Sequence, residues 1–546
     1  MNYIIAIDQS TSATKALLFD EHCHVVARSS VEHRQYYPQS GWVEHDAEEI
    51  YRNTVEAIRV LSVECRVLSV EFAAAIPSPD GTAVANSTLN TLHSTLSLAI
   101  TNQRETVVVW NKTTGKPIAN ALVWQDTRGK DLCQQLRADG MTDMVMAKSG
   151  LLIDPNFSAS GVKWLLDNID GARQQAERGE LLMGTIDTWL IWKLTKGRVH
   201  ATDTTNASRT MLFNIHTMQW DDDLLALFDI PRSMMPEVKA CDEIYGETTV
   251  EGLCPEPIAI AGVLGDSHGA LVGQMCFERG SGKVTYGTGS SVMVNIGHEP
   301  LTPPQGLVTS VGFTAFGKTW YGFEGNIYST GATLKWMCDQ LQLVGKPQEM
   351  EALATSVADN GGVYVVPAFS GLGAPWWQSN VKGAIVGLTF ATTKAHVVRA
   401  ALESIAFQIK DLVDAMIGNE KRSVESEPFA TADPSDEGMA AANATPYTLH
   451  STLTEVCADG GPTKNHFLMQ LQADLLRTPV ICTEVDDASA LGAAIMNGFA
   501  RKQWNSFDEV IPLRKVTQIY QPQDDSQAAL YEGWRQAVNT LITQSS

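Results

Sequence analysis

An arginine and a glutamate stand side by side where an apolar segment of the chain ends. The run Leu98–Ile100 is followed by Thr101-Asn102-Gln103 and then by Arg104 and Glu105. A carboxylate accepts hydrogen bonds and a guanidinium donates a planar fork of them, so such a pair can hold a small molecule rich in hydroxyls. Trp124 would give the carbon edge of that ligand an apolar surface. The simpler alternative is a surface ion pair beside a core tryptophan.

Turns rich in serine and threonine follow strand-like segments in both halves of the chain. Tyr3–Ile7 is a β-rich apolar run, and the segment from Asp8 to Lys15 predicts the turn of a hairpin. The segment 282–291 contains a second turn of this kind between strand-like runs. Such turns can present N–H and O–H donors to a phosphate, and Asp8 at a strand end can hold Mg²⁺ through water. Taken singly, each segment is more simply an ordinary turn.

Two further strand-like runs end in residues that suit a binding site. Ile258–Leu264 ends at Gly265 and Asp266, and the segment 455–458 leads through Asp459-Gly460-Gly461 to an apparent helix from Phe467. A pair of glycines between a strand and a helix lets a flat ligand approach the backbone. Both halves therefore open with strand, acidic residue, hydroxyl-rich turn and strand, which indicates two similarly built units.

The composition is that of a large, acidic, globular enzyme. A chain of 546 residues can form two or more domains, and its net charge of −22 argues against nucleic acid or an anionic membrane as a partner. Nine dispersed cysteines without metal-ligand spacing indicate reduced thiols. The N-terminal segment is too short and uncharged for a signal peptide, and no apolar run reaches membrane-spanning length. We therefore expect a cytoplasmic protein that is not inserted in a membrane.

These motifs, with several longer strings, resemble the FGGY family of carbohydrate kinases and, within it, the glycerol kinases most closely. The resemblance implies an α/β fold of two actin-like (ribonuclease H-like) ATPase domains with an interdomain cleft. It places an N-terminal, polyol-binding domain at residues 1–256 and a C-terminal, nucleotide-binding domain at residues 257–546. The matching strings lie at 41–46, 101–105, 184–190, 205–210, 370–375, 383–403 and 459–461.

The resemblance implies ATP-dependent phosphorylation of a terminal hydroxyl of a small polyol, with glycerol as the default substrate. A four- or five-carbon polyol or a ketose is the alternative within the family. Xylulose-type members usually carry a Met-His pair where this chain has residues 103–105, which favours a polyol. A non-catalytic, sugar-sensing protein on the same fold is the alternative from another class. Family members are often dimers or tetramers, so we expect a homodimer or homotetramer.

The resemblance also assigns roles to individual residues. Asp266 matches the general base that takes the proton from the attacking hydroxyl; without the resemblance, it is more simply a turn or helix-cap residue. Arg104, Glu105 and Trp124 match the family's polyol clamp, and Asp8 would face Mg²⁺ together with Asp266. The substrate-binding positions are then Arg104, Glu105, Trp124, Asn156, Asp266, Ser267 and Ser291. The ATP-binding positions are Thr11, Ser12, Ala13, Lys15, Thr288, Gly331, Lys335, Gly461 and Asn465.

Three substitutions remove bulk from the expected polyol site. Glycerol kinases usually have tyrosine, glutamine and an aromatic residue where this chain has Asn156, Ser267 and Ser291. Because the polyol clamp is retained, a pocket hollowed at its other end suggests a longer polyol, whose additional hydroxyls would pair with Asn156, Ser267 or His268. Alternatively, other side chains refill the space and glycerol remains the substrate.

The nucleotide side and two insertions also depart from the family pattern. Ser10, Ala13, Lys15 and Lys335 replace the usual glycine, hydroxyl residue, arginine and glutamine, which predicts a shifted nucleotide affinity in an active kinase. The insertions span roughly residues 64–97 and 419–454 and share the hexapeptide Thr-Leu-His-Ser-Thr-Leu. We expect them to be exposed and partly disordered, with docking arms for a partner as the alternative.

Overall fold

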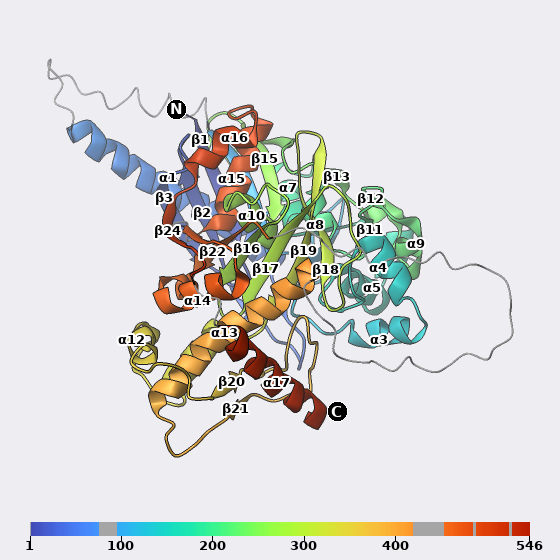
Figure 1. Ribbon diagram of the computed structural model, residues 1–546. Helices are drawn as coiled ribbons and strands as arrows, with labels where there is room; N and C mark the ends of the chain where they lie inside the picture. The colour runs from blue at the N-terminus through green and yellow to red at the C-terminus, as the bar shows by residue number, and fades with distance from the viewer. Residues whose placement is uncertain (1, 76–95, 419–452, 484–486, 524–526, 546) are drawn as a thin grey trace.

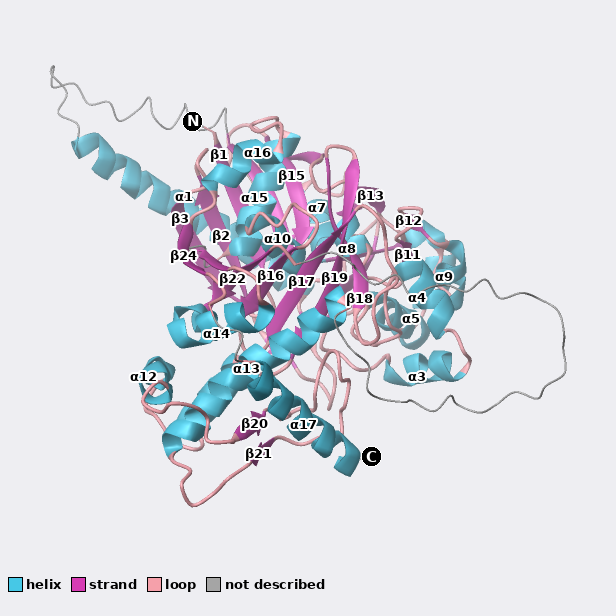
Figure 2. Cartoon of the chain, viewed as in Figure 1, coloured by secondary structure: helices cyan, strands magenta, loops and turns pink. Residues whose placement is uncertain are grey.

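Two large β-sheets form the centre of the molecule, with helices around them (Figures 1 and 2). This computed structural model describes residues 2–75, 96–418, 453–483, 487–523 and 527–545. Within this part of the chain, no helix is both long enough and apolar enough to cross a membrane.

The first sheet has the strand order β14-β15-β6-β1-β2-β3. Its centre is apolar and buried on both faces, as is usual for parallel strands covered by helices. β1 pairs with β2 in antiparallel and with β6 in parallel orientation, so the predicted hairpin is confirmed. The strands are β1 (Tyr3–Gln9), β2 (Ala13–Phe19), β3 (Val25–Glu32), β6 (Leu96–Asn102), β14 (Ile244–Thr248) and β15 (Ile258–Gly265).

The second sheet repeats this arrangement, in the order β18-β19-β17-β16-β22-β23-β24. β16 pairs with β17 in antiparallel and with β22 in parallel orientation, as β1 does with β2 and β6. The chain thus contains the same strand pattern twice, as expected for two actin-like domains. The strands are β16 (Ser281–Tyr286), β17 (Ser290–Gly297), β18 (Val308–Ala315), β19 (Lys318–Ile327), β22 (Glu455–Gly460), β23 (Val480–Thr483) and β24 (Val516–Tyr520).

A third sheet, in the order β4-β5-β8-β7-β9, lies beside the first and carries several short helices. The remaining strands pair in twos. These strands are β4 (Gln35–Tyr36), β5 (Glu44–His45), β7 (Val107–Asn111), β8 (Ala121–Leu122), β9 (Leu181–Thr185), β10 (Ala201–Asp203), β11 (Phe213–Asn214), β12 (Gln219–Trp220), β13 (Glu237–Lys239), β20 (Tyr364–Val366) and β21 (Ala384–Val386). The helices are α1 (Ala47–Ala75), α3 (Lys130–Ala138), α4 (Thr142–Ser149), α5 (Ser158–Asn168), α6 (Ala172–Glu177), α7 (Ile186–Leu194), α8 (Thr204–Ala207), α9 (Asp222–Leu227), α10 (Asp266–Gly273), α11 (Gly331–Asp339), α12 (Met350–Ala354), α13 (Lys394–Ile417), α14 (His466–Leu476), α15 (Ala488–Ala500), α16 (Phe507–Val510) and α17 (Ala528–Ser545).

Helices α10 and α15 lie between the two large sheets and share one apolar core with both (Figure 1). α15 is rich in alanine and glycine and is buried on almost all sides, as a helix enclosed by other elements must be. The two helices approach so closely that a Cβ at Gly492 would lie 1.9 Å from the Gly269 carbonyl oxygen. Since α10 begins at Asp266, α15 supports the element that carries the predicted base.

The expected domain boundary falls near a strand that joins the first sheet. β15 follows residue 256 in the chain, yet it is hydrogen-bonded to β6. α15, from the C-terminal part, packs on the same sheet. The division at 256/257 therefore stays a prediction.

The two insertions lie largely outside the described residues, which omit 76–95 and 419–452. At the start of the first insertion, the structure differs from the expected loop. There α1 continues as a helix to Ala75. The expected exposure and disorder of the rest stay untested.

The close approach of α10 and α15 predicts that a methyl group at Gly492 destabilises the fold. Gly492→Ala should lower the free energy of unfolding by about 1–3 kcal/mol, because neither helix backbone can move away within the packed core. The measurement is urea unfolding followed by circular dichroism.

Gly161→Ala is the matched control, since Gly161 lies within α5 and the atoms nearest to its added Cβ belong to side chains, namely Leu122 Cδ1 at 3.2 Å and Val107 Cγ1 at 3.9 Å. There the better helix propensity of alanine should leave stability unchanged or raise it by up to about 1 kcal/mol. Equal effects of the two substitutions would contradict the packing account.

Candidate active site

Asp266 lies where a strand of the first sheet passes into a helix. β15 ends at Gly265, and Asp266 is the first residue of α10. The Gly265 N–H donates to the Thr205 hydroxyl at 2.9 Å, and this hydroxyl donates to the buried carboxylate of Asp203 at 2.5 Å. These two groups fix the backbone that carries Asp266.

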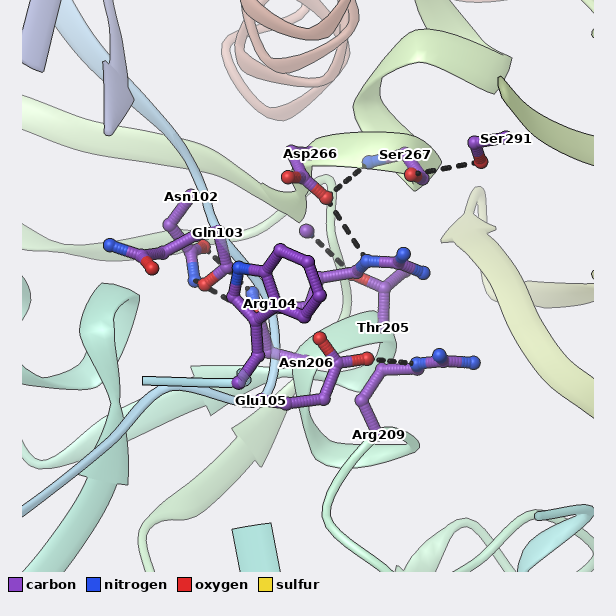
Figure 3. A network of polar contacts seen from close by, with 12 residues as sticks. Asn102, Gln103, Arg104, Glu105, Thr205, Asn206, Arg209, Asp266, Ser267 and Ser291 are labelled. Carbon is purple, nitrogen blue, oxygen red and sulfur yellow. Dashed lines mark hydrogen bonds and ion pairs between the residues drawn. The ribbon is translucent and has the colours of Figure 1, made fainter. Parts of the chain in front are cut away.

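Arg104 pairs with Asp266 across neighbouring strand ends (Figure 3). Arg104 follows β6, and Asp266 follows the adjacent parallel strand β15. Arg104 Nε lies 3.0 Å from Asp266 Oδ1, with 9% of the arginine side chain and 38% of the aspartate side chain exposed. The structure thus brings the predicted base and the predicted polyol clamp together, and it leaves the base open to a ligand.

Glu324 holds the other side of Arg104 from the second sheet. Its side chain is 1% exposed on β19. Its Oε2 accepts a hydrogen bond from Arg104 Nη1 at 2.9 Å, and its Oε1 forms an ion-pair contact with Arg104 Nη2 at 2.8 Å. Arg209 donates to Glu324 at 2.8 Å and to Glu105 at 2.6 Å. We call Arg104, Glu105, Arg209 and Glu324 the buried charge cluster.

The electrostatics of the buried charge cluster are balanced. Burial alone would raise the pKa of Glu324, but the guanidinium groups of Arg104 and Arg209 lower it well below its usual value. Burial raises the pKa of Glu105, and the same two arginines oppose that rise. Because two cations face two anions at hydrogen-bond distance, removal of one member would leave the buried charges unbalanced.

Sequence reasoning missed Glu324 and gave Arg209 no role. Arg209 lies within one of the strings that resemble the family, but its partner Glu324 lies more than one hundred positions away in the chain. A usable signal existed in the segment 321–325, where Glu324 is the one charge in an otherwise uncharged strand segment. A lone carboxylate in a buried strand requires a partner.

Glu105 and Asn156 line one small cavity together with Phe157. Glu105 has φ of 64°, a left-handed conformation that is uncommon outside glycine and that often marks functional positions. Its carbonyl oxygen accepts a hydrogen bond from Ser158 at 2.7 Å. The structure therefore places Asn156 beside the clamp glutamate.

Trp124 connects the polyol clamp to the first hydroxyl-rich turn. Its indole Nε1 donates to the Thr11 hydroxyl at 3.0 Å, and 38% of the residue is exposed. Ser10 closes this turn through a hydrogen bond from its hydroxyl to the Ala13 carbonyl, at 2.9 Å. Ser12 is exposed beside Thr11. The turn thus presents hydroxyls next to the clamp.

Ser267 and Ser291 approach each other from the two halves of the site (Figure 3). Their hydroxyl oxygens are 3.3 Å apart, and the Ser267 N–H donates to Asp266 at 2.6 Å. Lys283 Nζ, which sequence reasoning missed, donates to Ser291 at 3.0 Å. His268 was expected as a possible hydroxyl partner, but its ring is fully buried, so it does not face a ligand there.

Asp8 lies opposite Lys15 in the β1–β2 hairpin. Lys15 Nζ is 3.7 Å from Asp8 and donates to Asp487 at 2.6 Å. Burial raises the pKa of Asp8 to about 6; Lys15 lowers it, whereas Asp266 and Asp487 raise it further. Asp8 thus belongs to the same electrostatic environment as the predicted base.

A cavity of about 620 Å³ opens on the second sheet at the predicted nucleotide positions. Asn465 is not among the residues that line it, since its side chain caps α14 by accepting from the Leu468 N–H at 2.9 Å. Gly331 approaches the Gly287 carbonyl so closely that an added Cβ would lie 2.6 Å from it. The lining includes Gly287, Thr288, Gly331, Lys335, Trp336 and Gly461.

The buried charge cluster predicts a large stability loss on neutralisation of Glu324. Glu324→Gln should lower the free energy of unfolding by about 3 kcal/mol or more, because two buried arginines lose their common counterion. Glu48→Gln is the matched control, since Glu48 pairs with Lys193 at 2.9 Å but is 33% exposed; a loss of about 1 kcal/mol or less is expected there. Similar losses in urea unfolding would contradict the cluster's importance.

Known proteins match nearly the whole chain. Residues 3–273 match the N-terminal domain, and residues 282–501 the C-terminal domain, of the FGGY family of carbohydrate kinases. Glycerol kinase 1 of Thermotoga maritima is 44% identical over 99% of this chain and 100% of its own length. The glycerol kinase of Shewanella pealeana is 45% identical over 98% of both chains.

Two solved structures superimpose on nearly the whole of this chain. The glycerol kinase of Plasmodium falciparum, solved with ADP, superimposes with a TM-score of 0.84 at 32% identity, over 99% of this chain and 98% of that one. A xylulose kinase from Lactobacillus acidophilus has the same fold, with a TM-score of 0.79 at 20% identity over 99% of this chain and 98% of that one. The chain belongs to the FGGY family of carbohydrate kinases.

Proposed function

We propose that this protein transfers the γ-phosphoryl group of ATP to a terminal hydroxyl of a small polyol, as a glycerol kinase does. Full-length relatives at 44–45% identity bear that name, and a structural neighbour was solved with ADP. The observation that carries the proposal is the position of Asp266. Its partly exposed carboxylate pairs with the arginine of the polyol clamp and raises the pKa of Asp8, which lies at the start of the first hydroxyl-rich turn.

The reaction follows from the residues around Asp266. The terminal hydroxyl of the polyol gives its proton to the Asp266 carboxylate as its oxygen forms a bond to the γ-phosphorus. The bond between that phosphorus and the bridging oxygen breaks, and ADP leaves. Arg104 and Glu105 hold the other hydroxyls, and the buried charge cluster keeps both side chains in place before the substrate arrives. Positioning of this kind supplies most of the catalysis that phosphoryl transfer needs.

The nucleotide would occupy the cavity on the second sheet. Thr288 is exposed at the tip of the β16–β17 turn, where its hydroxyl and the neighbouring N–H groups can meet phosphate oxygens. Trp336 and Lys335 also line the cavity, and a flat base could lie against them. Thr11 and Ser12 would meet the γ-phosphoryl group from the first sheet.

Asp8 and Asp266 would hold Mg²⁺ with the phosphates of the nucleotide. The described residues contain no group of three or more metal-binding side chains, which agrees with an ion bound by two carboxylates, waters and phosphates. The raised pKa of Asp8 also fits, because a cation relieves a carboxylate that burial and two neighbouring carboxylates destabilise. When bound, the ion neutralises charge that develops on the phosphates.

An oligomer and a location in the cytoplasm complete the proposal. We propose a homodimer or homotetramer, as the resemblance to the family implies. The dispersed cysteines, eight of which are free and buried in the described part of the chain, support a reducing compartment.

Replacement of the proposed base gives the direct test. Asp266→Asn should lower kcat about 10²- to 10⁴-fold in a coupled ADP-release assay with Mg-ATP and glycerol, because the amide cannot take the proton. Binding of ATP, measured by calorimetry, should persist. Asp139→Asn, on an exposed position after α3, is the control that should keep full activity. An Asp266→Asn protein with full activity would refute the role of the base.

The raised pKa of Asp8 predicts a pH-dependent requirement for Mg²⁺. As pH falls below about 6, Asp8 becomes protonated and loses its charge, so the apparent affinity for Mg²⁺ should fall by up to about tenfold per pH unit. In Asp8→Asn this dependence should flatten at a weaker affinity. ATP's own titration is common to both proteins, so the difference between them isolates Asp8. Parallel profiles from pH 5 to 8 would contradict the assignment.

A further inference from the structure

A lysine and two serines form a set of donors beyond the polyol clamp. Lys283 and Thr285 are two residues apart on β16, so their side chains project from the same face of the second sheet. Ser291 on β17 lies directly opposite Thr285, so it projects from the same face. Lys283 Nζ donates to Ser291 at 3.0 Å and to Thr285 at 3.3 Å. Ser267, at the start of α10, closes the set across the junction, 3.3 Å from Ser291.

Lys283 fixes the direction of the hydrogen bonds in this set. An ammonium group has only donors, so Ser291 must accept from it, and the Ser291 proton turns toward Ser267 or toward a ligand. When Ser291 donates to Ser267, the hydroxyl proton of Ser267 can be donated to a ligand. Within the described residues, Ser291 is the hydrogen-bond partner of the Ser267 hydroxyl. A polarised series of donors, from Lys283 through Ser291 to Ser267, thus ends beside Asp266.

The surroundings of Lys283 favour a neutral ligand group over an anion. The lysine is 1% exposed; burial and the Arg104 guanidinium lower its pKa, whereas the carboxylates of Asp459, Glu324 and Asp266 raise it. Three carboxylates already surround this ammonium group, and a further anion would face their repulsion. Ser267 and Ser291 are both partly exposed, so a hydroxyl group of a ligand can reach them.

We infer that Ser267, Ser291 and Lys283 form a subsite for an additional hydroxyl, and that the preferred acceptor is an open-chain polyol of four carbons. This inference rests on the proposed function. A three-carbon polyol has one reacting hydroxyl for Asp266 and two for Arg104 and Glu105, which leaves this subsite unused. A fourth hydroxyl uses it. A site built to bond a hydroxyl discriminates strongly against a ligand that lacks it, since its polar groups are then left unpaired.

The test compares kcat/KM for glycerol, erythritol, threitol, xylitol and ribitol in a coupled ADP-release assay with Mg-ATP. A four-carbon polyol should exceed glycerol by roughly tenfold or more. The specificity ratio is kcat/KM for the four-carbon polyol divided by kcat/KM for glycerol. Ser291→Ala and Lys283→Met should lower this ratio by roughly tenfold. Ser291→Thr keeps the hydroxyl and should therefore keep most of the wild-type ratio. Ser291→Phe, which fills the subsite, should move the preference toward glycerol.

Ser356→Ala and Lys410→Met are the matched controls. The Ser356 hydroxyl donates a hydrogen bond to the Leu353 carbonyl at the end of α12, and Lys410 pairs with Asp414 on α13. Both should keep the wild-type ratio, and circular dichroism confirms that each variant is folded. If glycerol gives the highest kcat/KM and the Ser291 variants keep the ratio, the subsite is refuted while the kinase stands. If no polyol releases ADP, the proposed function itself fails.

Discussion

The site depends on one guanidinium group held between two carboxylates from different sheets. Arg104 is bound by Glu324 of the second sheet on one side and by Asp266 of the first on the other. The arginine therefore cannot move toward a ligand or away from the base without breaking a buried ion pair. Arg209 extends the same constraint to Glu105. In the proposed mechanism, one group of contacts that spans both halves of the chain thus sets both substrate recognition and the position of the base.

The duplicated fold explains why these residues meet. In each half, a hairpin and a parallel strand place polar residues at the same edge of the sheet, and α10 and α15 pack between the two sheets. Glycines let the backbones of α10 and α15 approach closely at this junction. The second sheet also carries the cavity proposed for the nucleotide and the Lys283–Ser291 pair, so in the proposed reaction phosphate donor and acceptor would meet where the halves join.

Much of this site could be predicted from the sequence because its signals are local. The hairpins at residues 3–19 and 281–297, and the strand ends before Arg104 and Asp266, follow from runs of apolar residues and the turns that interrupt them. Glu324 and Lys283 could not be predicted in this way, since their partners come from strands that meet only in the folded sheet. The continuation of α1 to Ala75 and the burial of His268 likewise depend on structure that no local pattern records.

We propose that Glu324 acts on the reaction through Arg104 and Asp266. A double-mutant cycle of Glu324→Gln and Asp266→Asn, measured as kcat/KM for the preferred polyol, tests it most directly. If Glu324 serves to position these groups, its replacement should cost about tenfold less in the Asp266→Asn protein than in the wild type, a coupling of about 1.4 kcal/mol. Losses that simply add in the double variant would contradict the account.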